Sequence, residues 1–160
     1  MPAITALLHT ENDALRLGRC LETLYPCDSI LVVDHGSRDA TVNLAREYGA
    51  RVLKAVPGAS PAHYIRSADP GWIFCLDPHE SMSENLGASI YEWKLGAAAV
   101  PPIRAFSVFL REETAEGWVQ VPVAQTRLVP PDWNRWDGSL PSADPSALAL
   151  EGELLRFAFP

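Results

Sequence analysis

Apolar runs alternate with amphipathic segments through the first 96 residues of the chain. Short, mainly apolar runs mark the expected strands, and residues 30–33 are continuously apolar, as expected of a strand that is buried on both faces of a sheet. In the segments between them, apolar residues recur every three or four positions, which is typical of amphipathic helices. This alternation predicts a mostly parallel, doubly wound α/β sheet with right-handed crossovers. The expected strands span residues 4–8, 29–33, 51–56 and 72–76, and the expected helices span residues 12–25, 39–48, 60–67 and 83–96.

The expected helices have recognisable start and stop signals. Asn12, Asp39 and Ser83 are suited to the N-cap position, where a side-chain oxygen accepts a free backbone N–H. Pro61 is suited to the first turn of the third helix. Gly49 follows the second helix and predicts a left-handed residue that ends it.

The second half of the chain has a different pattern. Residues 104–110 and 118–129 flank a polar turn at 112–117, which predicts antiparallel strands and therefore a mixed sheet. Four prolines between residues 130 and 146 predict an irregular loop there. Residues 148–155 are expected to form a final short element.

Composition narrows the class of protein. The chain has 160 residues, the size of one domain, and 48% of them are hydrophobic, as in folded proteins. Its formal charge is -7 and it has no run of Lys or Arg, which argues against nucleic-acid or anionic-membrane partners. We see no signal peptide and no membrane-spanning segment. Three cysteines without a paired spacing give no disulfide framework, so we expect a reducing, cytoplasmic setting and leave self-association open.

Polar side chains gather where three of the expected strands end. Carboxyl ends of parallel strands meet at one edge of a sheet, and ligands of α/β proteins bind there. Turns and caps favour Asp, Asn and Ser whatever the function, but they do not require histidines or an acid directly after an apolar strand. We therefore interpret the set as a candidate site, made of His9, Thr10 and Asn12, then Asp34, His35, Ser37 and Asp39, then Asp77, His79 and Glu80.

Four segments carry a family resemblance through their order and spacing. They are LHTEND (8–13) with LETL (21–24), ILVVDHGSRDAT (30–41), AREYGARV (45–52) and GWIFCLDPHE (71–80). Together they resemble family 2 glycosyltransferases, particularly the branch that builds lipopolysaccharide cores. The resemblance implies a GT-A fold, a Rossmann-like, mostly parallel mixed sheet flanked by helices. It also implies a nucleotide-sugar-binding half (1–96) and a truncated acceptor half (97–160).

The resemblance further implies a nucleotide-diphospho-sugar ligand, of the uridine type. Thr10 and Asn12 match the loop beside the nucleotide, and Asp34 matches the acid that reads the base or ribose. The nucleotide-binding residues implied are Thr10, Asn12, Asp34, Ser37, Asp39, Arg66 and Asp77.

A divalent metal, Mn²⁺ or Mg²⁺, is implied at the motif that follows the fourth strand. Asp77 matches the first acid of the family's DxD signature, and His79 takes the place of the second acid. Such a metal neutralises the charge of a leaving nucleoside diphosphate. Imidazole is a softer ligand than carboxylate but still suits Mn²⁺.

The general base is the least defined part of the interpretation. In the family a His-Glu pair follows the segment that resembles residues 136–142, but Pro141 and Ser142 stand there in this chain. Glu80, Asp137 and Asp132 are the remaining candidates for the carboxylate that deprotonates an acceptor hydroxyl. Three hypotheses follow. They are an active transferase with an unknown acceptor, a catalytically degenerate nucleotide- or partner-binding relative, and a transition-metal site built from the four histidines with Asp77.

Overall fold

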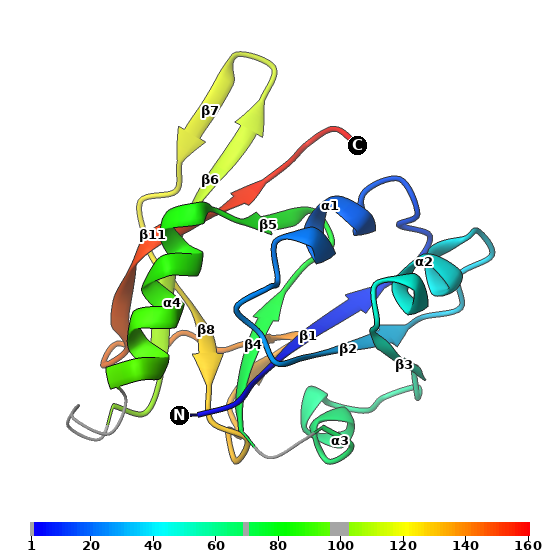
Figure 1. Ribbon diagram of the computed structural model, residues 1–160, viewed down its shortest axis with the longest axis horizontal. Helices are drawn as coiled ribbons and strands as arrows, with labels where there is room; N and C mark the ends of the chain where they lie inside the picture. Colours follow the sequence, from blue (N-terminus) through cyan, green and yellow to red (C-terminus); the bar gives the residue numbers. More distant parts are fainter. Residues whose placement is uncertain (1, 69–70, 97–102) are drawn as a thin grey trace.

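A nine-stranded mixed sheet forms the centre of the protein (Figure 1). The structure, a computed structural model, describes residues 2–68, 71–96 and 103–160. The main strand order is β3-β2-β1-β4-β8-β6-β11-β5, and β7 pairs with β6 beside this path. The strands are β1 (Ile4–Thr10), β2 (Ser29–Asp34), β3 (Arg51–Lys54), β4 (Trp72–Leu76), β5 (Glu80–Met82), β6 (Phe106–Thr114), β7 (Gly117–Gln120), β8 (Gln125–Val129) and β11 (Leu148–Arg156). The helices are α1 (Leu17–Glu22), α2 (Thr41–Glu47), α3 (Pro61–Ile65) and α4 (Glu84–Gly96), and β9 (Trp136–Asp137) pairs with β10 (Leu140–Pro141).

The four parallel strands confirm the expectation from the apolar runs. β1 lies between β2 and β4 and pairs in parallel with both, and β2 pairs in parallel with β3. Side chains of β1, β2 and β4 are buried on both sides of the sheet, which is why their sequences are mainly apolar. β8 then pairs antiparallel with β4, so the sheet is mixed as expected.

The two faces of the sheet have separate apolar cores. On one face, α1, α2 and α4 pack against Ile4, Leu8 and Phe74 among others. On the other face, α3 and the loop after β8 cover Leu7 and Val33, and Trp133 is buried in this second core. Because the crossovers place helices on both faces, the architecture is the doubly wound one expected.

Several local expectations were wrong. α1 begins at Leu17, so Asn12 is not its N-cap. Instead Asn12 has a φ of 54° and belongs to a loop whose side chains bind the neighbouring strand-end loop. The segment expected as one strand at 118–129 is two, β7 and β8, and the expected loop at 130–146 contains the short pair β9 and β10. β5 was missed because it has only three residues.

The structure agrees better with the other expected helix ends. The Ser83 hydroxyl accepts the N–H of Leu86 at 3.2 Å at the start of α4. Asp39 accepts the N–H of Thr41 at 3.0 Å, although Ala40 occupies the N-cap position of α2. Gly49 has a φ of 80°, as the end of α2 required.

The two halves of the chain share one sheet. The expected division between residues 96 and 97 falls beside 97–102, which lie outside the described residues, so that division stays a prediction. β4 and β8 join the halves through direct strand pairing. Within the described residues, the longest helix is too short and too polar to span a bilayer.

Candidate functional site

The carboxyl ends of β2, β1 and β4 lie side by side at one edge of the sheet. Thr10 at the end of β1 is paired with Asp34 at the end of β2, and Leu8 is paired with Leu76, directly before Asp77. Asp34 and Asp77 therefore lie at the same edge, on either side of β1. Adjacent strands are about 4.8 Å apart, so the strands that carry them are about 10 Å apart.

Asp34 shapes the loop that follows it. Its Oδ1 accepts the hydroxyl of Ser37 at 2.5 Å, and its Oδ2 accepts the backbone N–H groups of Gly36 and Ser37 at 3.2 and 3.1 Å. Gly36 has a φ of 90°, a conformation that glycine adopts without strain. Three of the roughly four lone-pair positions of the carboxylate are thus used inside the loop.

The loops after β1 and β2 are held together by side chains that the sequence analysis singled out. Asn12 donates its backbone N–H to the Ser37 hydroxyl at 2.9 Å and accepts the N–H of Arg38 at 2.8 Å. Thr10, buried at the end of β1, donates its hydroxyl to Asp13 at 2.7 Å. Asp13, absent from the predicted set, in turn donates its N–H to the Thr41 hydroxyl at 2.9 Å.

Asp39 completes this pair of loops. Its carboxylate accepts the hydroxyl and the N–H of Thr41, and also the N–H of Ala14 at 3.2 Å. The hydrogen bond from the Thr41 hydroxyl is the main reason why the pKa of Asp39 is below its usual value. The structure therefore brings together the five predicted residues Thr10, Asn12, Asp34, Ser37 and Asp39. Most of their hydrogen bonds are made within these two loops.

A cleft of about 400 Å³ opens beside Asp34. Pockets for small ligands usually have volumes of 300 Å³ or more. His35, Lys54, the loop that continues to residue 59, and Tyr64 of α3 line the cleft with Asp34. The Tyr64 hydroxyl holds this loop by accepting the N–H of Val56 at 2.9 Å and donating to its carbonyl at 3.3 Å. Asp77 and His79 are not among the lining residues.

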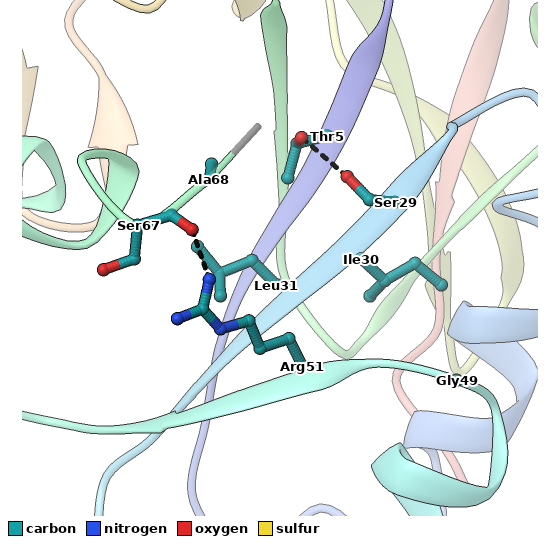
Figure 2. Close-up of a pocket in the computed structure, with 8 residues that line it drawn as sticks. All are labelled: Thr5, Ser29, Ile30, Leu31, Gly49, Arg51, Ser67 and Ala68. Carbon is teal, nitrogen blue, oxygen red and sulfur yellow. Dashed lines mark hydrogen bonds between the residues drawn. The ribbon is translucent and has the colours of Figure 1, made fainter. Parts of the chain in front are cut away.

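Arg66 is the one predicted nucleotide-binding residue that lies away from this edge. α3 runs from the cleft toward the other end of the sheet, and Arg66 is its exposed C-cap residue. The next residue, Ser67, accepts a hydrogen bond from Arg51 at 2.5 Å. Ser67 and Arg51 line a pocket of about 140 Å³ at the amino ends of β1 and β2, together with Thr5 and Ser29 (Figure 2).

Two of the histidines form a pair. His9 Nδ1 is 2.9 Å from His35 Nε2, and the edge of the Tyr64 ring packs against His9. Burial and the neighbouring His35 lower the pKa of His9 to about 4, so His9 is neutral near pH 7. The transition-metal hypothesis is wrong, because the described part of the chain, which includes all four histidines and Asp77, contains no cluster of three metal-binding side chains.

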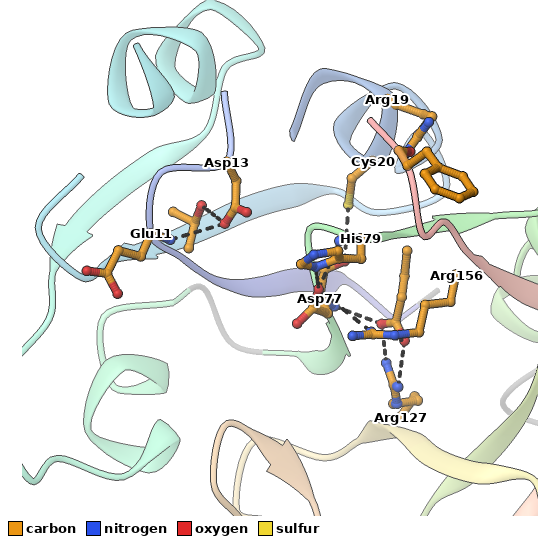
Figure 3. A network of polar contacts seen from close by, with 11 residues as sticks. Glu11, Asp13, Arg19, Cys20, Asp77, His79, Arg127 and Arg156 are labelled. Atoms are coloured by element: carbon orange, nitrogen blue, oxygen red, sulfur yellow. Dashed lines mark hydrogen bonds and ion pairs between the residues drawn. The ribbon is translucent and has the colours of Figure 1, made fainter. Parts of the chain in front are cut away.

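Asp77 and His79 face one another across the turn that follows β4 (Figure 3). Asp77 Oδ1 accepts the backbone N–H of His79 at 2.9 Å and is 2.5 Å from His79 Nδ1. Burial by itself would raise the pKa of Asp77. The hydrogen bonds with His79 and the charge of Arg156 lower the pKa by more than burial raises it, so the net pKa is below its usual value. Asp77 is therefore a carboxylate at neutral pH.

Glu80 does not have the setting of a general base. It is fully buried, and Arg127 donates to both of its carboxylate oxygens at 2.7 and 2.9 Å. Its Oε1 also accepts the backbone N–H of Asp77 at 2.8 Å, which ties it to the turn that holds the DxD-like motif. The geometry thus favours a structural role, in which Glu80 positions Asp77.

The other two acids, Asp132 and Asp137, are exposed. Asp137 of β9 lines a second cleft, of about 410 Å³, with Gln125, Arg127 and Leu140. Asp132 is 3.5 Å from Arg104 in an exposed ion pair. Asp137 is therefore the candidate base that lies in a cleft, and its role stays a prediction.

Two arginines near Asp77 were missed by the sequence analysis. Arg127 is the one charged residue of β8 and is followed by the apolar Leu128 and Val129, and a charged residue inside a strand can indicate a buried partner. Arg156 lies at the end of β11, and its guanidinium is 3.8 Å from Asp77 Oδ1. Its sequence context, a basic residue between Leu155 and Phe157, gave no indication of this neighbour.

Comparison with known proteins adds two kinds of similarity. No protein-family model matches the chain. An uncharacterized glycosyltransferase of Rickettsia felis is 34% identical over 92 residues, which are 54% of this chain and 32% of that protein. A TPR repeat-containing protein of Synechococcus elongatus is 31% identical over 130 residues, 78% of this chain and 30% of that protein. The chain thus spans about a third of the length of these curated relatives.

Solved structures show the same fold at low sequence identity. Glucosyl-3-phosphoglycerate synthase from Mycobacterium tuberculosis, in complex with Mn²⁺, UDP-glucose and phosphoglyceric acid, superposes with a TM-score of 0.54 at 17% identity. That match covers 69% of this chain and 44% of the synthase. TarS of S. aureus (residues 1–349) superposes with a TM-score of 0.52 at 16% identity, over 76% of this chain and 38% of TarS. The chain therefore has a GT-A fold, and about half of it is similar in sequence to a glycosyltransferase.

Proposed function

We propose that the protein binds a nucleotide-diphospho-sugar of the uridine type at the edge formed by β2, β1 and β4, and transfers the sugar to an acceptor. The observation that supports this most is the placement of Asp34 and Asp77 on either side of β1 at one edge of the sheet. The cleft beside Asp34 would take the base and ribose, and Asp77 would face the diphosphate. A structural neighbour of the same fold was crystallised with Mn²⁺ and UDP-glucose.

The residues present fit a divalent metal that is shared with the ligand. Asp77 Oδ1 and His79 Nδ1 are adjacent, and both would offer lone pairs once the proton between them is lost. The described residues provide no third ligand nearby, but Mg²⁺ and Mn²⁺ are commonly held by one or two side chains with substrate phosphates and water. When bound, the metal would neutralise the charge of the departing nucleoside diphosphate.

The chain's own residues would do the remaining work. The network of Asp34, Asn12 and Ser37 fixes the loops on the nucleotide side, so little ordering is left to occur on binding. Glu80 and Arg127 hold the turn that carries Asp77. Asp137 is proposed to accept the proton of the acceptor hydroxyl. Membership of the lipopolysaccharide-core branch is part of this proposal, and the acceptor is left open.

Nucleotide binding can be tested by calorimetry with UDP and Mn²⁺. Replacing Asp77 with Asn should weaken binding by about tenfold or more, because a charge-assisted contact is lost. Asp132→Asn is the matched control, since it removes the same charge from an exposed ion pair away from the edge and should bind as the wild type does. No binding of UDP or of any other nucleoside diphosphate by the wild-type protein would contradict the proposal.

Measuring turnover distinguishes an active transferase from a catalytically degenerate relative. A panel of nucleotide sugars with Mn²⁺ should give release of nucleoside diphosphate, and Asp137→Asn should reduce this release without changing UDP affinity. Binding without release across the panel would instead support a degenerate relative. The missing His-Glu pair and the buried position of Glu80 favour that second candidate.

A further inference from the structure

Arg156 is held by its backbone at the edge of the proposed diphosphate site. It ends β11 and pairs with Glu80 of β5 on one side and with Glu112 of β6 on the other. The next residue, Phe157, donates its N–H to the carbonyl of His79 at 2.8 Å. The backbone of Arg156 is therefore tied directly to the turn that contains Asp77 and His79.

Among the described residues, the carboxylates near the guanidinium of Arg156 all lie at long distances. Its Nη1 is 3.5 Å from Glu80 Oε2 and 3.8 Å from Asp77 Oδ1 (Figure 3). A well-formed bond between a guanidinium and a carboxylate is about 2.7–2.9 Å long. The side chain is also 38% exposed, so it can move without leaving a buried charge behind.

Glu80 does not need Arg156 as its counter-ion. Arg127 already binds both oxygens of Glu80 within the protein, and its own side chain is only 2% exposed. Arg156 therefore lies beside a carboxylate that is neutralised and another, Asp77, that it reaches only at 3.8 Å. Within the part of the chain that the structure describes, Glu80 at 3.5 Å is the hydrogen-bond acceptor of this guanidinium, and a loosely held, partly exposed guanidinium is suited to binding phosphate oxygens.

We propose that Arg156 binds the diphosphate of the nucleotide ligand directly. This inference rests on the proposed function, and it adds a residue that the family resemblance did not indicate. The guanidinium would turn from Asp77 toward the phosphate oxygens and offset part of their charge. Arginine suits this task because its planar fork donates two parallel hydrogen bonds to one phosphate.

The test compares UDP with uridine, because only UDP carries the diphosphate. In calorimetry, Arg156→Gln should weaken UDP binding by about tenfold or more and leave uridine binding unchanged. Arg156→Lys should have an intermediate effect, because it keeps the charge but not the fork. Arg111→Gln is the matched control, since Arg111 lies on the neighbouring strand β6, is similarly exposed and is 3.7 Å from Glu153, and it should leave both affinities unchanged.

A measurement without mutation guards against variants that do not fold. An arginine-directed dicarbonyl reagent, followed by peptide mass spectrometry, should modify Arg156 and Arg111 in the free protein. UDP should protect Arg156 and not Arg111, and uridine should protect neither.

The outcomes distinguish this inference from the proposed function. If wild-type protein binds UDP but Arg156→Gln binds UDP equally well, or if UDP gives no protection, the role of Arg156 is overturned and the proposed function stands. If wild-type protein binds no nucleoside diphosphate at all, both are overturned. An equal loss of UDP and uridine affinity in Arg156→Gln would indicate a structural role and would likewise overturn the inference.

Discussion

At the scale of single residues, the polar side chains of the edge mostly satisfy one another. Asp34, Asn12 and Asp39 each accept at least one backbone N–H from a loop that follows β1 or β2. Such bonds are favoured because a buried or half-buried N–H without a partner is costly. The same residue types thus serve as turn formers and, in the proposed function, as ligand contacts.

His9 makes the protein sensitive to acid. Its pKa is about 4 in the folded protein and 6.5 in its ordinary setting, so the unfolded chain binds the proton more tightly. The contribution of neutral His9 to stability should be complete above pH 6.5 and should decline as the pH falls toward 4. The loss is at most about 3–4 kcal/mol, because the pKa is lowered from 6.5 to about 4 and one pKa unit corresponds to about 1.4 kcal/mol.

Urea unfolding at a series of pH values measures this effect. His9→Asn keeps a polar atom near the position of Nδ1 but does not titrate, so the slope of stability between pH 6.5 and 4 should become shallower. His63→Asn serves as the control, since His63 is exposed on α3, and its slope should match the wild type. An unchanged slope in His9→Asn would show that His9 is not the titrating group.

At the scale of elements, β11 depends on a glycine where it crosses the start of α4. Gly152 has a φ of 89° and lies where the register of β11 against β6 shifts. A Cβ atom built on it would be 2.2 Å from the backbone N of Leu86 in α4. The strand and the helix can approach this closely only because residue 152 has no side chain.

Gly152→Ala should therefore destabilise the protein by about 3 kcal/mol or more, since it adds a backbone clash to left-handed strain. Gly49→Ala is the matched control, because Gly49 also has a positive φ of 80° but has open space around its Cβ position. That variant should lose only about 1–2 kcal/mol. Equal losses of unfolding free energy in the two variants would exclude the clash as the cause.

Elements were predictable where their signal is local. The limits of β4 agree with its continuous apolar run. β1 and β2 are only two residues and one residue longer than the strands expected there. β5 could not be found, because its three residues become a strand only through pairing with β11. The division of 118–129 into β7 and β8 has a similar reason, since the two strands pair with different parts of β6.

At the scale of the whole molecule, one buried ion pair joins the four parallel strands β1–β4 to the second half of the sheet. Glu80 accepts the N–H of Asp77 after β4 and binds Arg127 of β8, and it pairs with β11 through its backbone. Arg127 also donates to the Cys75 carbonyl at 3.2 Å. Three strands that are distant in sequence thus meet at this pair.

Arg127→Met should cost about 3–5 kcal/mol of unfolding free energy, because it leaves a carboxylate buried without its partner. Adding Glu80→Gln to that variant should recover part of the loss, since the unpaired charge is removed. Arg104→Met breaks an ion pair whose partners are 64% and 69% exposed, and it should cost less than about 1 kcal/mol. Similar losses for Arg127→Met and Arg104→Met in urea unfolding would refute the central role of the buried pair.

The sequence by itself determined the parallel half of the sheet and the edge at which Asp34 and Asp77 meet. Apolar continuity, periodicity and strand ends are local properties, and parallel pairing then brings the strand ends together. Only the tertiary structure decided that Glu80 is buried against Arg127, that Arg66 lies at the far end of α3, and that Arg156 reaches Asp77. Those outcomes depend on which strands become neighbours across gaps of dozens of residues, and no local pattern in the chain records such pairing.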